Sequence, residues 1–290
     1  MRTQVVLLAA GAMLAFAANS VLARLALGAA DAGAAVYTGA RLLSGAATLA
    51  IIVGLRMKVS TVARMNDSWP GALTLLGFAL AFSVAYVVLG AATGALILFG
   101  SVQFSMLGWA IFKGERPNAI EWLGVGVASA ALIFLLGPSL QAPHPMDAML
   151  MMIAGACWAA YSVIGRGSRA PLADNASNFI RCAPVAILLM VAGLLSEPLT
   201  AAGLAYAVMS GAIASGVGYA VWYSVLPSLS RTSSAFIQLT VPVLAAAGGV
   251  LLIGEQMTGH LLLASAGVIG GIARTLWGSK WGQGSANARS

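Results

Sequence analysis

Apolar runs of about 20 residues recur along nearly the whole chain, and they restrict its fold more than any other feature of the sequence. Each run is long enough to cross the hydrocarbon core of a bilayer as an α-helix. We therefore expect ten transmembrane helices, at residues 4–23, 33–55, 69–90, 93–112, 118–137, 146–166, 174–196, 201–226, 232–253 and 258–277. Only 8% of the residues are charged, against about 25% in a soluble domain. Because the alternating short strands of an outer-membrane barrel are missing, the sequence predicts an all-α integral membrane protein.

The basic residues predict how these helices are oriented. With ten spans, both termini and the even-numbered loops lie on one side of the membrane. Twelve of the fifteen Lys and Arg residues fall on that side: Arg2, Arg56, Lys58, Arg64, Lys113, Arg116, Arg166, Arg169, Arg231, Arg274, Lys280 and Arg289. Since basic residues collect in cytoplasmic loops, we expect both termini in the cytoplasm. Topology thus explains the net charge of +7, and no nucleic-acid partner is inferred from it.

A sequence repeat indicates how the spans are grouped. Residues 16–24 read FAANSVLAR and residues 158–166, which start 142 positions later, read WAAYSVIGR, with five of nine positions identical. Five spans per copy is an odd number, so the second copy enters the membrane from the opposite face. Because its partner lies mid-chain, the first span is expected to stay in the mature protein and not to be cleaved as a signal peptide. We predict two inverted five-helix repeats around a central cavity, residues 1–141 and 142–277, followed by a disordered cytoplasmic tail at 278–290.

An inverted repeat of this kind predicts a transporter, because it places the substrate site near the midplane and lets it open alternately to each side. Further pairs follow at an offset near 140: Arg41 in TGARLL with Arg181 in NFIRCA, and the Gly-Glu of FKGERP with that of LIGEQM. With these motifs the chain resembles the drug/metabolite transporter superfamily, and within it the EamA-type exporters. It is most similar to the bacterial aromatic amino-acid exporters, which implies amino-acid efflux across the bacterial inner membrane. One departure is Pro242, whose counterpart is Val102 where members often carry a second proline.

Polar and large aromatic side chains within the spans, at positions matched between the repeats, are the candidates for contact with a substrate. The predicted substrate-binding residues are Asn19, Phe82, Tyr86, Gln103, Trp158, Tyr161, Tyr219, Tyr223 and Gln238. Aromatic walls with a few orienting polar groups are typical of small-molecule pockets, and an amide inside a bilayer needs a polar partner or water. Helix packing is the alternative role for the same residues, because polar side chains also join membrane helices.

Arg41 and Arg181 lie within spans two and seven. Either is a possible partner for a substrate carboxylate. Each, however, is close enough to the end of its span to snorkel to the interface, and the resemblance makes the pair a feature shared by both halves. We therefore interpret both arginines as structural.

Residue types and motifs that the predicted spans lack restrict the possible mechanism. All eight Asp and Glu residues fall in predicted loops or near span ends, so neither strong proton coupling nor a preference for cationic drugs is expected, although Glu121 in early span five leaves coupling open. The sequence contains no HExxH helix and no Gly-rich phosphate cradle. No enzyme, catalytic residue, metal or cofactor is therefore predicted, and Cys157 and Cys182 are interpreted as core residues in separate spans.

The prediction is an inner-membrane exporter of amino acids, broad in range and including aromatic ones, that works by alternating access. Efflux of other hydrophobic metabolites or drugs is the alternative. A channel is disfavoured because the polar groups cluster at mid-span and form no continuous stripe. Since ten helices can enclose a cavity alone, a monomer in the lipid bilayer is expected in preference to a dimer.

Overall fold

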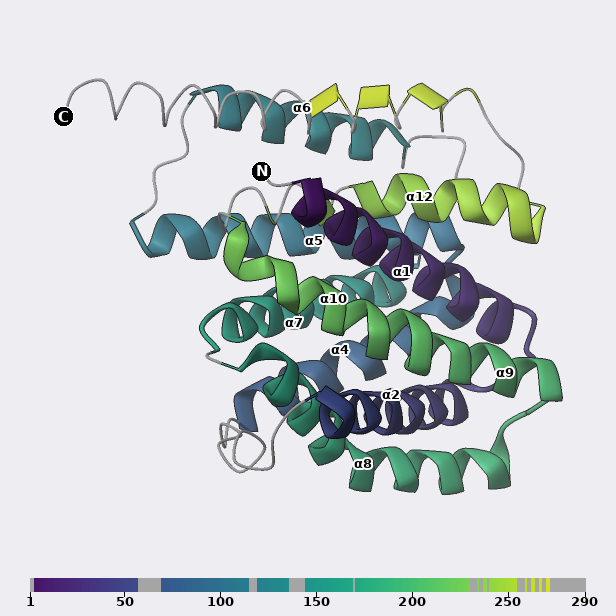
Figure 1. The fold of residues 1–290 in the computed structure, drawn as a ribbon. Helices are drawn as coiled ribbons and strands as arrows, with labels where there is room; N and C mark the ends of the chain where they lie inside the picture. The colour runs from purple at the N-terminus through teal and green to yellow at the C-terminus, as the bar shows by residue number, and fades with distance from the viewer. Residues whose placement is uncertain are drawn as a thin grey trace.

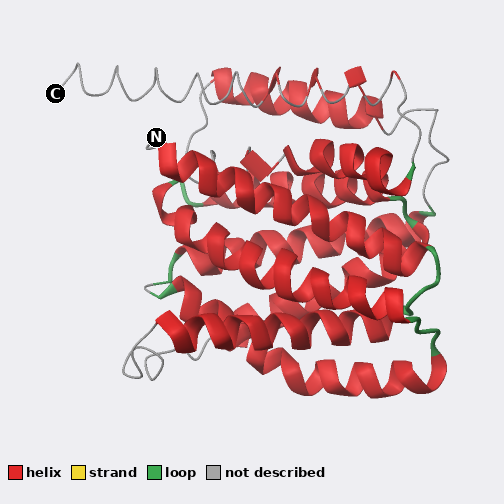
Figure 2. Ribbon diagram, turned by 45° about the vertical axis from the view of Figure 1, so that its right-hand side comes forward, coloured by secondary structure: helices red, strands yellow, loops and turns green. Residues whose placement is uncertain are grey.

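The structure is a computed structural model that describes residues 3–56, 69–114, 119–135, 144–168, 170–229 and 240–254, with single positions or pairs between residues 234 and 271. In this part of the chain, helices are joined by short loops (Figure 2). An isolated β-bridge joins Ala32 to Leu199.

The helices run back and forth through one bundle (Figure 1). In chain order they are α1 (Thr3–Gly28), α2 (Ala34–Arg56), α4 (Trp69–Val88), α5 (Ala91–Phe112), α6 (Ala119–Leu135), α7 (Pro145–Arg166), α8 (Pro171–Ser196), α9 (Ala201–Met209), the π-helix η1 (Ser210–Val217), α10 (Gly218–Val225), the 3-10 turn η2 (Leu226–Ser228), α12 (Thr240–Gly248) and the π-helix η3 (Gly249–Ile253). A helix satisfies every backbone group within its own segment, which is what an apolar run needs in lipid. Pro145 and Pro171 occupy the first positions of α7 and α8, where a missing N–H costs nothing.

Seven helices are long and apolar enough to cross a membrane, counting Ala201–Ser228 as one continuous span. They lie close to expected spans one to four and six to eight, although α1 continues past Arg24 to Gly28. The chain is therefore a multi-pass, all-helical membrane protein. Span five overlaps α6 and span nine overlaps α12 and η3, which are shorter apolar helices. Apart from isolated positions, span ten lies outside the described residues, and so does the predicted tail at 278–290.

Helices that are distant in sequence meet in the bundle. α2 packs along α8, α4 and α5 pack on α7, and α1 contacts α4, the continuous α9–α10 span and α12. The buried side chains form one cluster that is rich in aromatic rings. The outer surface is also apolar, with Leu195 84% and Leu251 80% exposed. Such side chains suit a surface that faces lipid, where a soluble protein would face water.

One end of the bundle is tied together by the connections 31–36 and 197–200. Oε2 of Glu197 accepts hydrogen bonds from the backbone N–H groups of Ala35 and Val36, each at 3.0 Å. The first N–H groups of a helix have no partner within the helix, so Glu197 at the end of α8 caps the start of α2. This cap joins segments that are 161 and 162 residues apart.

Candidate functional site

The first cavity lies where α1, α4, α5, α7 and α10 meet, and we call it the central cavity. It is lined by Phe16, Asn19, Ser20, Phe78, Phe82, Leu98, Phe99, Trp158 and Tyr219. Its volume is about 20 Å³, which is room for a water molecule but not for an amino acid. Side chains fill the centre of the bundle in this conformation, so any larger ligand has to displace some of them.

Trp158 of α7 is the side chain around which the central cavity is built. Its ring centroid lies 4.8 Å from that of Tyr219 and 5.3 Å from those of Phe16 and Phe78. Aromatic pairs in such geometry add about 0.5–1.5 kcal/mol each beyond their burial. Nε1 of Trp158 also donates a 2.7 Å hydrogen bond to Oε1 of Gln238. Gln238 thereby fixes the orientation of the indole.

A chain of buried polar groups reaches the central cavity from α2. The Tyr37 hydroxyl donates to Oγ of Ser210 at 2.8 Å, and Ser210 donates to Oδ1 of Asn19 at 2.5 Å. These bonds connect α2, η1 and α1. Because Asn19 lines the central cavity, it gives a polar edge to a space whose other walls are mostly aromatic.

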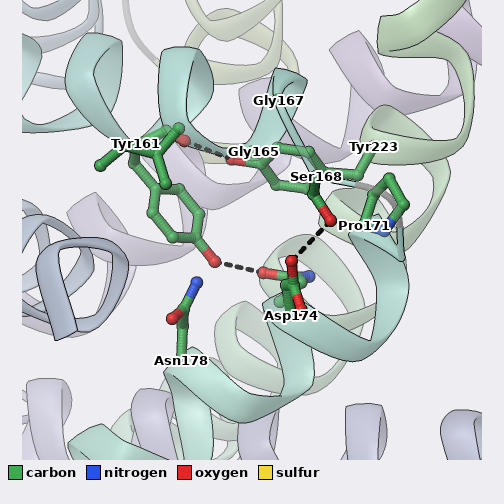
Figure 3. Close-up of a pocket in the computed structure, with 10 residues that line it drawn as sticks. Tyr161, Gly165, Gly167, Ser168, Pro171, Asp174, Asn178 and Tyr223 are labelled. Carbon is green, nitrogen blue, oxygen red and sulfur yellow. Dashed lines mark hydrogen bonds between the residues drawn. The ribbon is translucent and has the colours of Figure 1, made fainter. Parts of the chain in front are cut away.

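The second cavity lies beside the turn between α7 and α8 (Figure 3), and we call it the α7–α8 cavity. It is lined by Tyr161, Ile164, Gly165, Gly167, Ser168, Pro171, Asp174, Asn175, Asn178 and Tyr223. Its volume is about 140 Å³, close to the roughly 150 Å³ of an engineered cavity that accepts benzene. The Tyr161 hydroxyl donates to Oδ1 of Asn175. Oγ of Ser168 donates to Oδ2 of Asp174 at 2.5 Å, so this cavity has more polar walls than the central one.

Tyr161 adjoins both cavities. It lines the α7–α8 cavity, and its ring centroid lies 5.8 Å from that of Trp158 and 6.4 Å from that of Tyr219, which line the central cavity. Beside it, Nδ2 of Asn175 is buried and has no hydrogen-bond partner among the residues that the structure describes. An unpaired buried donor costs about 1–3 kcal/mol, a cost that a polar ligand or a water molecule would remove.

The nine residues predicted to bind substrate fall into three groups. Those that line the central cavity are Asn19, Phe82, Trp158 and Tyr219. Those that line the α7–α8 cavity are Tyr161 and Tyr223. Those that line neither cavity are Tyr86, Gln103 and Gln238.

Two members of the third group are buried in other places. Tyr86 lies near the end of α4, where its hydroxyl donates to the carbonyl oxygen of Ala91 at 3.3 Å and its ring packs on Phe82. Gln103 of α5 is 3% exposed, and its Oε1 has no hydrogen-bond partner within the described part of the chain. That Tyr86 and Gln103 contact a substrate therefore stays a prediction.

Arg41 lies in the centre of the bundle, although the sequence favours a structural role for it near the interface. It is 1% exposed, so it does not snorkel, and its guanidinium carbon lies 5.0 Å and 4.9 Å from the ring centroids of Phe78 and Phe82. Arg181 is only partly buried and lies over the ring of Trp69. An Arg near the middle of a membrane helix costs about 2.5–3.5 kcal/mol on insertion scales. The sequence repeat pairs the positions of the two arginines, but the structure buries Arg41 and leaves Arg181 partly exposed.

The described residues contain no group of three His, Cys, Asp or Glu side chains that could hold a metal ion. Cys157 and Cys182 are both free thiols. Sγ of Cys182 is buried and donates to the carbonyl oxygen of Ala72 at 3.4 Å, which is a packing contact between α8 and α4.

Comparisons with known proteins identify what the chain is similar to. Residues 146–277 match the EamA-like transporter family. The chain is 48% identical over 265 residues to the uncharacterized protein PA1977 of Pseudomonas aeruginosa, covering 91% of this chain and 92% of that one. It is 24% identical over 223 residues to a probable amino-acid metabolite efflux pump of Escherichia coli, covering 70% and 73%. It is 27% identical over 174 residues to the threonine/homoserine exporter RhtA of Escherichia coli, covering 55% of each chain. A crystal structure with 20% sequence identity matches its fold with a TM-score of 0.74, covering 95% of this chain and 98% of the other.

Proposed function

We propose that the chain, whose residues 146–277 match the EamA-like transporter family, is a transporter of that family and exports amino acids, including aromatic ones, across the bacterial inner membrane by alternating access. The family consists of membrane transporters, and the chain is not an enzyme. Its relatives include a threonine/homoserine exporter and a probable amino-acid metabolite efflux pump. The observation that carries the amino-acid proposal is the central cavity, where aromatic rings surround a polar edge at Asn19. Pockets for small molecules commonly have this composition.

The architecture proposed for this function is ten helices in two inverted repeats. Helix packing supports it, because the contact of span three with span six (α4 on α7) has a counterpart in the contact of span eight with span one (α9 and α10 on α1). Likewise α5 on α7 corresponds to α12 on α1. A two-fold axis in the membrane plane relates contacts in such pairs and leaves the substrate site between the repeats.

In the proposed cycle, the α7–α8 cavity is the vestibule on the cytoplasmic side, an orientation that follows from the distribution of basic residues. A substrate would first meet the polar groups of Asn175 and Asp174 there. The ring of Tyr161 adjoins the route onward to the central cavity. Rotation of Tyr161, together with separation of the rings around Trp158, would then make room for the substrate at the centre.

Counterflow in proteoliposomes tests the proposed function. Vesicles that hold unlabelled amino acids receive trace amounts of labelled phenylalanine, threonine and other amino acids, with one cationic dye and one sugar for comparison. Saturable exchange that unlabelled amino acids inhibit is the expected result. Equal flux of all solutes without saturation would identify a channel, and exchange confined to the dye would identify a drug-efflux carrier.

We also expect this exchange to proceed without a proton gradient. The acidic side chains that the structure describes lie at helix ends or in turns: Asp31, Asp147, Asp174 and Glu197. The described residues place no carboxylate inside a span and so contain no proton carrier. The side chain of Glu121 lies outside the described residues. The measurement is counterflow at equal pH on both sides. An absolute requirement for a pH difference, abolished by Glu121→Gln, would contradict the expectation.

Trp158→Ala is expected to lower the ratio of phenylalanine to threonine transport roughly two- to tenfold, because the lost ring contacts are worth about 0.5–1.5 kcal/mol. Threonine offers no ring to stack, so its transport loses less. Trp109→Ala is the matched control, since Trp109 is 39% exposed on α5 and lines neither cavity. Both rates are normalised to folded protein. An unchanged ratio in Trp158→Ala would assign Trp158 to packing alone.

A further inference from the structure

Arg41 carries a buried positive charge that the described part of the protein does not neutralise. An arginine side chain stays protonated in proteins, and this one is 1% exposed. Its Nε donates to Oγ of Ser215 and its Nη2 to the hydroxyl of Tyr219, each at 3.2 Å. Both acceptors are neutral. Within the described residues no carboxylate pairs with Arg41, and its Nη1 has no hydrogen-bond partner.

The guanidinium group lies against the walls of the central cavity. Phe78 and Phe82, whose rings it faces at 5.0 Å and 4.9 Å, both line that cavity, and so does Tyr219, which accepts its hydrogen bond. A ligand that spreads these rings would therefore come next to the unpaired Nη1. Buried charges are normally paired, because an isolated one is costly in an apolar interior.

Building on the proposed function, we propose that Arg41 binds the carboxylate of the transported amino acid. The planar guanidinium group offers a fork of donors that suits a carboxylate better than any other acceptor in an amino acid. The aromatic rings beside it would hold the substrate side chain, and the hydroxyls of Ser215 and Tyr219 hold the guanidinium in place. A buried cation here also repels an amine that lacks a carboxylate.

Arg181 supplies a matched comparison, because it is the counterpart of Arg41 in the second repeat. Arg181 is only partly buried, and its guanidinium carbon lies 5.6 Å from the ring centroid of Trp69. It lines neither cavity. A structural role common to both repeats would make the two arginines respond alike to substitution, whereas a substrate contact affects Arg41 alone.

The first test uses the wild-type protein in proteoliposomes that exchange labelled phenylalanine. The competitors are 3-phenylpropionate, which keeps the ring and the carboxylate, and 2-phenylethylamine, which keeps the ring and the ammonium group. We expect 3-phenylpropionate to inhibit about tenfold more strongly or better, since hydrogen bonds to charged groups are among the strongest. Equal inhibition by the two compounds, or stronger inhibition by the amine, would overturn the proposal.

The second test compares Arg41→Gln and Arg41→Lys with Arg181→Gln. Arg41→Gln should raise the half-saturating concentration of phenylalanine about tenfold or more and abolish inhibition by 3-phenylpropionate. Arg41→Lys should retain part of the affinity for phenylalanine and part of the inhibition. Arg181→Gln should leave the affinity and the inhibition near the wild-type values. Thermal unfolding shows whether each variant is folded. If Arg41→Gln does not fold, the competitor test on the wild-type protein still decides. Unchanged affinity in a folded Arg41→Gln variant would overturn the proposal.

Direct binding separates this proposal from the proposed function. Tryptophan fluorescence of the purified protein reports binding of 3-phenylpropionate whether or not amino acids are exchanged. If the wild-type protein exchanges no amino acid, the proposed function fails, while binding that Arg41→Gln abolishes still supports a carboxylate site. Binding that persists in Arg41→Gln would overturn it. Displacement by equimolar inorganic phosphate would overturn it too, because the site would then hold anions in general.

Discussion

Glu197→Ala is expected to lower the free energy of unfolding by about 1–3 kcal/mol, since hydrogen bonds to a charged group and to a helix N-terminus are lost together. The carboxylate accepts from Ala35 and Val36 at 3.0 Å, and alanine would leave both N–H groups at the start of α2 without that acceptor. Glu197→Gln should lie between the wild type and Glu197→Ala, because its amide oxygen still accepts but carries no charge.

The same substitution should loosen the end of the bundle where α1–α2 meets α8–α9. There the Gly33 N–H donates to the carbonyl oxygen of Pro198 at 3.0 Å, and the Thr200 N–H donates to that of Asp31 at 2.7 Å. Under the alternating access proposed above, these connections would have to part when the protein opens at this end. Removing Glu197 would therefore favour the opened state and allow the amides of 31–36 to exchange.

Hydrogen exchange followed by mass spectrometry is the measurement. Faster exchange in peptides that cover 31–36 is expected for Glu197→Ala. Ser196→Ala is the control, because Ser196 is exposed and its hydroxyl donates only within its own helix, to the carbonyl oxygen of Ala192. Exchange in 31–36 that is equal in Glu197→Ala and in the wild type would show that the carboxylate does not hold this end closed.

The positions of the helices could be predicted from the sequence because lipid imposes a length and an apolar composition on every span. Pro145 and Pro171 stand at the first positions of α7 and α8 for another local reason, because proline lacks the N–H that a helix interior needs. The cap that Glu197 provides could not be predicted, because its partners lie 161 and 162 residues away in the chain. A short sequence pattern does not indicate a contact between segments so far apart in the chain.

The site was less predictable than the helices, since apolar composition does not tell which face of a membrane helix points inward. Trp158 and Tyr219 line the central cavity. Gln238, which the sequence predicts equally well as a substrate contact, holds the indole of Trp158 in place. Arg41 is the residue whose environment the sequence predicts least well. It occupies the position that the repeat pairs with Arg181, and the contacts that bury it, with Ser215 and the rings of Phe78 and Phe82, come from other helices of the bundle.

Close packing of α2 against η1 is what places Ser215 beside Arg41, and it depends on Gly211. A Cβ atom at Gly211 would lie 2.0 Å from Oγ of Ser44 and 2.1 Å from the backbone oxygen of Arg41. A side chain can turn aside, but the backbone of α2 can move only with the whole helix. Gly211→Ala is therefore expected to push η1 away from α2 and to destabilise the protein by about 1–3 kcal/mol, the range for overpacked cores.

Gly54→Ala is the matched control, because Gly54 lies in α2 with nothing within 4 Å of an added Cβ atom. There alanine should be neutral or stabilise by up to about 1 kcal/mol, since glycine weakens a helix interior. Thermal unfolding of the purified variants measures the difference. Adding Ser44→Ala to Gly211→Ala removes the hydroxyl but leaves the Arg41 carbonyl, so only part of the lost stability should return. Equal unfolding temperatures for Gly211→Ala and Gly54→Ala would mean that α2 and η1 can separate freely, and the packing that buries Arg41 would then be too weak to hold its guanidinium in one place.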